Sequence, residues 1–535
     1  MLTETANGHT RRSFQRPSWR PSFWPRVREF AVPPAMIETA TARRRAGDWA
    51  GACAAAGVDV DLNPRALTAT HGRELAARVL DDLRHLAPDL LRWHLPRIAP
   101  DGLLRPGLTV ALARYDTGAR DGAPHAVRLV ARTPPAWADA GQRISLALWD
   151  GSRPGAGAFG HRDPHPHPSR RFRFDLHRHL WDVRRADELR VRSGADRPRV
   201  DGAPDEGAPA EGLLARGSLA ADPDLLRAVP RGLPCAVDRW AAEAEILLRA
   251  EGRTDGLFAV RFGARRRLVL RLAGAGAVVV EGVAGVERAD GRAGRRADGR
   301  VDGRAGGDAG GRAVDAAALP VLPDAATWVL PDLGLLRTGA YDVDRLHPLV
   351  AAALVPDRPP ATVPPRTPDR AGEPRVVECR GARHRIGFVD GALAPLDHDP
   401  AEVRREELLV ALGGPPLPCL RAIDEAHRRP DCLTGVRERL DHGDTAGALA
   451  VVEGLLGPDA VLRDGPLRDE LAVAAERRIT YGLFRAGLLW AGARPVPGAG
   501  PSGRGGGRSG GTRPRPRPRT RGRNSRAHTR HSTAY

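Results

Sequence analysis

The fold is decided by residues 108–181, in which four short segments alternate apolar side chains with other residues: LTVAL (108–112), VRLVA (127–131), ISLAL (144–148) and FRFDL (172–176). Successive side chains of a β-strand point to opposite faces of the sheet, so an apolar residue at every second position makes one buried face. The residues between the segments include Asp-Gly and Pro-Pro pairs, which favour turns. The stretch therefore predicts a four-stranded antiparallel meander, and with helical segments on either side the predicted fold class is α+β.

The same stretch contains a dense cluster of histidines, at positions 161, 165, 167, 177 and 179. If the fourth strand continues past residue 176, then Asp175, His177 and His179 share one face, with neighbours about 6.6 Å apart along the strand. One carboxylate and two imidazoles at that spacing could bind a divalent metal, and a histidine of the preceding loop could complete the site. These three residues are a candidate metal site.

Arginines surround this cluster, and four of them are a candidate anion site: Arg170, Arg171, Arg173 and Arg178. Packed guanidinium groups repel a dication but attract a phosphate or carboxylate, which arginine binds through two parallel hydrogen bonds. A third interpretation needs no ligand. In it, residues 161–169 form a solvated loop, and His177 and His179 lie on the exposed face of an edge strand. The sequence leaves all three interpretations open.

All 83 basic residues of the 535-residue chain are arginine. The lack of lysine excludes P-loop nucleotide hydrolysis, Schiff-base and pyridoxal chemistry, protein-kinase transfer and Ser-x-x-Lys acyl transfer, which need an amine side chain. The excess of Arg, Ala, Gly and Pro is typical of a GC-rich genome of the actinobacterial type. The net charge of +18 is concentrated at the ends, because residues 501–535 carry ten arginines and no acid, and residues 1–30 carry +4. The basic composition therefore says little about the residues between, whose charge is nearly balanced.

The cysteines are odd in number and scattered, without a Cys-x-x-Cys pair: Cys53, Cys235, Cys379, Cys419 and Cys432. This pattern fits a reduced intracellular protein with buried thiols, and it argues against a zinc ribbon. Arg11-Arg12 is not followed by the apolar core of an export signal, and no apolar run reaches the ~18 residues of a membrane helix. We expect a cytoplasmic protein without a membrane partner, and the sequence identifies no cofactor.

Composition and periodicity divide the chain into eight parts. Tracts rich in Gly and Pro that lack large apolar residues bury too little surface to offset the entropy of ordering. We expect a disordered basic extension (1–34), helices plus the β-meander (35–190), a linker (191–217), an α/β segment with a hairpin (218–286), an Asp-Gly-Arg linker (287–318), a mixed segment with a Pro-rich break and a β-hairpin (319–398), a helical bundle (399–493) and a disordered Arg/Gly/Pro-rich tail (494–535).

Two patterns predict where particular helices begin and which side chains they bury. Asn63-Pro64 indicates the start of a helix whose apolar stripe runs from Leu67 to Leu86. Asp399-Pro400 indicates another start, at the beginning of the C-terminal bundle. We expect three leucines of that helix to be directed inward: Leu408, Leu409 and Leu412.

An octapeptide pattern occurs near both ends of the chain. The sequences GDWAGACA (47–54) and GDTAGALA (443–450) agree at six of eight positions. Small residues at the start of a helix permit close packing on a neighbouring helix, so we expect similar helical hairpins at both places. Two distant copies do not make a solenoid, and the alternative is coincidence in an Ala- and Gly-rich chain.

No catalytic motif stands in a context that supports it. The literal Gly-x-Ser-x-Gly match at 507–511 lies in the Gly/Arg-rich tail, and no His-Glu-x-x-His occurs. The leading hypothesis is therefore a non-catalytic interaction or scaffold protein whose partner is another protein. One alternative is a nucleic-acid or phosphate binder that uses the arginine-rich tails. Another is a metal-dependent hydrolase built on Asp175, His177 and His179.

Overall fold

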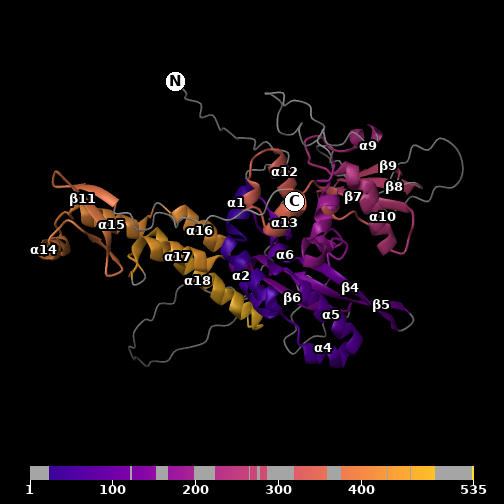
Figure 1. The fold of residues 1–535 in the computed structure, drawn as a ribbon, viewed down its shortest axis with the longest axis horizontal. Coiled ribbons are helices and arrows are strands. Elements are labelled where there is room, and N and C mark those ends of the chain that lie inside the picture. The colour runs from indigo at the N-terminus through magenta and orange to yellow at the C-terminus, as the bar shows by residue number, and fades with distance from the viewer. Residues whose placement is uncertain are drawn as a thin grey trace, which may run out of the picture.

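The computed structural model describes residues 23–120, 123–151, 167–197, 223–263, 266–273, 277–285, 318–357, 375–430, 432–457, 460–488 and 533–534. The fold is α+β, with several largely antiparallel sheets and helices toward both ends of the chain (Figure 1). Several predicted features lie wholly or largely outside the described residues: the first part of the N-terminal extension, the loop histidines at 161 and 165, the linkers at 191–217 and 287–318, the Pro-rich break and the basic tail from residue 494.

The central sheet has the strand order β1-β6-β5-β4. Its members are β1 (Val58–Val60), β4 (Thr109–Arg120), β5 (Ala123–Arg132) and β6 (Ile144–Trp149). The three strands predicted from alternation are confirmed and pair antiparallel, whereas β1, which was not predicted, pairs parallel to β6. Leu112, Leu129 and Ile144 are completely buried, so the apolar face is the one that the sequence indicates.

The prediction of a fourth strand at residues 172–176 is wrong. This segment runs beside the edge strand β4 and makes one bridge, from Ala111 to Arg173, before tight turns lead into the 3₁₀ helix η4 (Arg178–Leu180). Phe172 and Phe174 are buried, as the alternation requires. The backbone carbonyl of Phe174, however, accepts a hydrogen bond from the indole of Trp181 (3.1 Å) and not from a strand. The alternation therefore identified the buried side chains and not the backbone conformation.

Six helices precede β4 and share the main hydrophobic core with the central sheet: α1 (Trp24–Phe30), α2 (Pro34–Arg45), α3 (Trp49–Ala55), α4 (Pro64–His71), α5 (Arg73–His85) and α6 (Pro88–His94). The predicted disorder of residues 1–34 is wrong for its last part, because Trp24 and Val27 of α1 are buried in this core. Asn63 caps α4 as predicted, but the expected continuous helix is interrupted at Gly72.

A second core lies C-terminal to η4. It contains α10 (Trp240–Ala250), which packs on the antiparallel sheet β7-β8-β9, with Trp240, Leu247, Phe258 and Leu270 inside. The hairpin predicted in this region is part of a three-stranded sheet of β7 (Gly256–Phe262), β8 (Arg266–Ala273) and β9 (Ala277–Gly285). This core also includes residues of α9 (Pro223–Ala228), η6 (Val237–Arg239) and α11 (Asp324–Thr327). The elements whose buried residues, or the residues directly after them, join the main core instead are η5 (Val183–Glu188), α7 (Leu189–Ser193), α12 (Pro331–Arg337), η8 (Val343–Arg345) and α13 (Pro348–Leu354).

The C-terminal part begins with a three-stranded sheet and continues with helices: β10 (Arg375–Cys379), β11 (Ala382–Val389), β12 (Ala392–Pro395), α14 (Pro400–Ala411), α15 (Pro418–Arg428), α16 (Leu433–Asp441), α17 (Thr445–Leu456) and α18 (Pro466–Arg485). We call residues 375–428 the β10–α15 unit. It lies at one end of the molecule, with the β7-β8-β9 sheet at the other (Figure 1). The prediction that Leu408, Leu409 and Leu412 point inward is wrong, because all three are exposed.

Helices α16, α17 and α18 have a core of their own and dock on the N-terminal region. The docking includes η2 (Ala136–Ala138) and η3 (Ala140–Gln142), and the small sheet of β2 (Arg97–Ile98), β3 (Leu103–Leu104) and β13 (Thr533–Ala534) completes the described elements. At the contact, the buried guanidinium of Arg92 donates to three backbone carbonyls, those of Ala31 (2.9 Å), Gln142 and His442 (2.8 Å). Arg92 thereby joins α6 to segments from three other parts of the chain.

The repeated octapeptide forms the same turn in both places. Asp48 caps α3 by accepting from Gly51 N (2.8 Å), and Asp444 caps α17 by accepting from Gly447 N (2.9 Å). An arginine of the preceding helix pairs with each capping carboxylate: Arg43 with Asp48 (3.1 Å) and Arg439 with Asp444 (3.0 Å). The sequence similarity therefore corresponds to a shared helical hairpin.

Candidate functional site

His177 is buried beneath the second core and faces an acid that sequence reasoning did not connect with it. Its Nε2 atom lies 3.2 Å from Glu243 Oε2, and its Nδ1 atom lies 3.0 Å from the carbonyl of Arg173. Arg192 binds the same Glu243 carboxylate through two nitrogens, at 2.5 and 2.7 Å. Burial raises the pKa of Glu243, but the contacts with His177 and Arg192 have the larger combined effect and lower the pKa to about 2. Glu243 therefore stays ionised and is a buried partner for both His177 and Arg192.

The other two residues of the predicted metal site face different surroundings. The Asp175 carboxylate is bound by the guanidinium of Arg173 (2.9 Å), and His179 is buried, where burial lowers its pKa well below the usual value. The rings of His177 and His179 are 5.7 Å apart at their centroids. Among the described residues, Asp175, His177 and His179 are not a set of ligand atoms that lie close to one another. The hydrolase hypothesis thus gains no geometric support.

Each arginine of the predicted anion site has a partner within the chain. Arg170 donates to the carbonyl of Leu319 (2.9 Å), and Arg171 donates to Asp324 (3.0 Å). Arg173 binds Asp175 and Glu251 (both 2.9 Å), and Arg178 binds Asp182 (2.8 Å) and Asp82. An external phosphate would therefore compete with carboxylates that are already bound.

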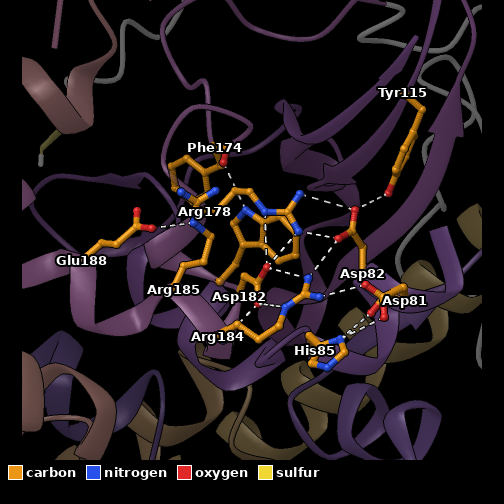
Figure 2. Close-up of polar contacts among 11 residues, drawn as sticks. Asp81, Asp82, His85, Tyr115, Phe174, Arg178, Asp182, Arg184, Arg185 and Glu188 are labelled. Atoms are coloured by element: carbon orange, nitrogen blue, oxygen red, sulfur yellow. Dashed lines mark hydrogen bonds and ion pairs between the residues drawn. The ribbon is translucent and has the colours of Figure 1, made fainter. Parts of the chain in front are cut away.

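Figure 2 shows the network around Arg178, which connects α5 with η4 and η5. Asp82 accepts a hydrogen bond from the hydroxyl of Tyr115 (2.6 Å) and also binds Arg178. Asp182 accepts from the backbone N–H of Arg184 (3.1 Å) and caps η5. Bonds from Arg184 and Arg178 lower the pKa of Asp182 against the opposing effect of its burial. Because these groups satisfy one another, the network is a structural brace between two parts of the main core.

The two best-formed pockets of the described residues are too small for a substrate. One, of about 20 Å³, is lined in part by His179, Arg192 and Trp328, and the other, of about 10 Å³, lies beside Arg28 and Trp93. Such volumes hold about one water molecule, whereas ligand sites occupy several hundred Å³. The buried histidines therefore line a packed interior.

A different set of donor atoms does converge, in the β10–α15 unit. Ligand atoms of Cys379, His398 and Cys419 all lie within 4.8 Å of one another. Cys379 ends β10, His398 follows β12, and Cys419 lies in the first turn of α15. Both cysteines are completely buried, and their thiols are free. Within the described residues this is the group whose chemistry best suits a metal ion.

Sequence reasoning missed this group because its members are far apart along the chain and belong to no motif. Cys-x-x-Cys spacing finds a metal site when both ligands lie on one turn, whereas here a hairpin end, a loop and a helix start each supply one ligand. Cys379↔Ala382 is the last pair of the β10–β11 hairpin. The sequence signal that could have indicated this metal site is a cysteine at a hairpin end followed by an isolated histidine, and this pattern is weak because it belongs to no motif.

The β10–α15 unit also carries an exposed apolar surface on α14. Leu408 is 66% exposed and Leu412 is 85% exposed, with Leu409 and Val410 beside them. The helix contacts the sheet through its acidic side, where Glu402 and Glu406 bind Arg380. We call Leu408, Leu409, Val410 and Leu412 the α14 surface.

Comparisons of the chain with protein-family models, with curated proteins and with solved structures find no match. None of the described helices combines the length and the apolar content that crossing a membrane requires.

Proposed function

We propose that the chain is a non-catalytic interaction protein that binds another protein through the α14 surface. The single observation that carries this proposal is the exposure of consecutive large apolar residues on one helix. An exposed apolar patch of this kind is typical of a docking surface, since water contact with several leucines is unfavourable. The proposal places the protein in the cytoplasm, where its five free cysteines would remain reduced.

The spacing on α14 suits recognition of a helix in a groove. Leu408 and Leu412 are four residues apart, so they lie on the same side of the helix, with Arg405 beside them. Apolar anchors at such positions are how an amphipathic helix fits an apolar groove of a partner. The neighbouring side, about 100° around the helix, is occupied, because Glu402 and Glu406 pair with Arg380. The helix is therefore held by its acidic side while its leucines face outward.

The charges beside the leucines indicate the chemistry of the partner. Arg404 and Arg405 are exposed, and each donates to a carbonyl of its own helix, at 3.4 and 3.1 Å. No acid of the described residues is bonded to either guanidinium. The partner that fits is a protein with an apolar groove and an acidic rim, because such a rim would complement both arginines.

The test is to compare one double variant with a matched control. L408E/L412E places two charges on the α14 surface. The control I479E/V461E places two charges elsewhere, on residues that are as exposed as the leucines: Ile479 (64%) matches Leu408, and Val461 (86%) matches Leu412. Partners captured from the native host after nuclease treatment would be identified by mass spectrometry, purified, and titrated against each variant. Losing the burial of two leucines should weaken binding by about 100-fold or more, and the control should bind like the wild type.

Three results would reject the proposal. The first is a partner that binds L408E/L412E and the wild type equally. The second is a self-association that the same double variant abolishes, because then the occupant is a second copy. The third is capture that nuclease or removal of residues 501–535 abolishes and that weakens steeply with salt. That result would assign binding to nucleic acid through the arginine-rich tail.

A further inference from the structure

The sulfur and nitrogen ligands of the β10–α15 unit come from three separate structural elements. Cys379 lies where β10 enters its hairpin turn, and Cys419 is the second residue of α15, a helix whose N-terminus has no side-chain cap. His398 lies in the connection between β12 and α14. We propose that Cys379, Cys419 and His398 bind one divalent ion of the zinc class. This site is independent of the docking function proposed for α14.

The surroundings of His398 are those of a metal-binding histidine. Its Nε2 atom is buried and has no hydrogen-bond partner in the structure, although a buried ring nitrogen normally has one. Its Nδ1 atom lies 3.5 Å from Glu402 Oε2, and Glu402 in turn accepts from Arg380 (2.7 Å). Metal-bound histidines almost always donate their second ring N–H to a carboxylate, a backbone carbonyl or a water, which orients the ring and increases its basicity. Glu402 is thus a positioning residue for His398.

The separations and the donor types fit zinc. Tetrahedral zinc with Zn–S of about 2.3 Å and Zn–N of about 2.0–2.1 Å needs donor atoms about 3.6–3.8 Å apart. The three atoms lie within 4.8 Å of one another, so movements of about 1 Å or less bring them to that spacing. Two thiolates and an imidazole select zinc over calcium or magnesium, which prefer oxygen ligands. On binding, the two thiols transfer their protons to solvent, and two S–Zn bonds form.

A second histidine packs against the proposed ligand His398. The ring of His384 stacks on that of His398, with centroids 4.2 Å apart and planes inclined by 11°. Because a metal ion lies in the plane of the imidazole that binds it, two parallel rings cannot bind the same ion. His384 therefore covers His398 and is not a ligand of the same ion.

The small core of this unit gives the ion a structural task. Its completely or nearly buried apolar residues are five, and two of them are the proposed ligands: Cys379, Ile386, Leu417, Cys419 and Ile423. A core of this size buries little apolar surface, and small units of this kind are commonly stabilised by a structural metal. The ion would tie the β10–β11 hairpin to α15 and to the start of α14.

The experiment uses the full-length chain purified in reducing buffer without chelator. Elemental analysis should find about one zinc per chain. After chelator treatment, titration with Co²⁺ should give a thiolate-to-cobalt charge-transfer band. C379S, C419S and H398A should lose the ion and the band, and the matched control C235S should keep both. E402Q keeps all three ligands and should bind the ion about 10–100-fold more weakly.

The titration of the wild-type chain decides the question even if a cysteine variant fails to fold. A reduced wild-type chain that contains no zinc and gives no charge-transfer band overturns the proposal. A disulfide between Cys379 and Cys419 in the native protein, detected by peptide mapping, also overturns it, because the sulfurs are then unable to bind the ion. An E402Q variant that binds the ion as tightly as the wild type would remove the positioning role of Glu402.

Discussion

Replacing Gly443 by alanine should cost much more stability than replacing Gly47, although both glycines occupy the same position of the same turn. Gly47 has φ +79° and Gly443 has φ +87°, so each adopts a left-handed conformation that a side chain disfavours. A Cβ atom at Gly47 would have no neighbour within 4 Å, whereas a Cβ atom at Gly443 would lie 2.1 Å from the carbonyl oxygen of Gly141. The two substitutions therefore separate the cost of the turn from the cost of docking.

The magnitudes follow from these contacts. A left-handed alanine costs about 1–2 kcal/mol, and the lower entropy of the unfolded chain returns about 0.4–1 kcal/mol, so G47A should cost about 1 kcal/mol. In G443A the segments of Gly141 and Gly443 must separate by more than 1 Å to relieve the clash. That movement breaks a bond from Arg92 to the carbonyl of Gln142 or His442, and a buried charged donor left without its partner costs about 1–3 kcal/mol. The total for G443A is about 2–4 kcal/mol.

Native-state hydrogen exchange measures this difference directly. The amides of α16 and α17 should show a lower opening free energy in G443A, and the amides of α2 and α3 should show a smaller loss in G47A. Urea unfolding followed by tryptophan fluorescence provides the corresponding global values. Equal costs for the two substitutions would refute the reasoning, because they would mean that the Gly141 contact does not hold the C-terminal helices in place.

Two further predictions concern buried charges. D332N should destabilise the protein by about 3–5 kcal/mol in urea unfolding, because it leaves Arg28, which is 2.7 Å from Asp332 and almost fully buried, without its counter-ion. E470Q removes the partially exposed pair with Arg437 and should cost less than about 1 kcal/mol, so similar costs for both variants would contradict this view of the core. Burial, and next the charges of nearby arginines, lower the pKa of His442 to about 3, so the stability that its neutral form provides is complete above pH 6.5 and is lost as the pH falls toward 3. Between pH 7 and 5 the H442Q variant should therefore lose about 2 kcal/mol less than the wild type, and parallel stability curves would exclude His442 as the titrating group.

Sequence periodicity predicted the strands that have one buried face. In β4, β5 and β6 the large apolar side chains recur at every second position, and this recurrence can be read directly, although smaller residues between them, such as Ala111 and Ala113 of β4, are buried as well. The segment Phe172–Leu176 shows the limit of such reading. Two buried phenylalanines two positions apart satisfy the alternation, yet the backbone turns at Phe174, directly after the bridge from Arg173 to Ala111, because the next N–H groups bond to the local carbonyls of Arg173 and Phe174. Short parallel strands such as β1 leave no pattern at all.

The errors in helices have a different cause. The aromatic residues of α1 lie among arginines and prolines, so their composition indicated disorder, but Trp24 is buried and Arg28 finds Asp332 about three hundred residues later. In α14 the leucines have a helical spacing that fits a buried stripe equally well. Which side of that helix is covered depends on Arg380, and no local pattern reports where a distant arginine will lie.

The candidate metal ligands were beyond sequence reasoning for a similar reason. The histidine cluster at 161–179 was a candidate site because its members are close along the chain, whereas Cys379, His398 and Cys419 come together only in the folded structure. The fold brings His177 to Glu243, a partner on α10 that lies 66 positions later in the chain. The sequence gives the chemical type of each candidate ligand, but the residues that surround it in space depend on the tertiary structure.

The contacts of Arg92 have a consequence for how the protein is made. A nascent chain that has left the ribosome as far as α6 contains this guanidinium but not the carbonyls of Gln142 and His442 that it needs. Arg28 has to wait similarly for Asp332. The hydrogen bonds of Arg92 are therefore complete only after translation has passed α16, although the apolar residues of the main core all precede that helix.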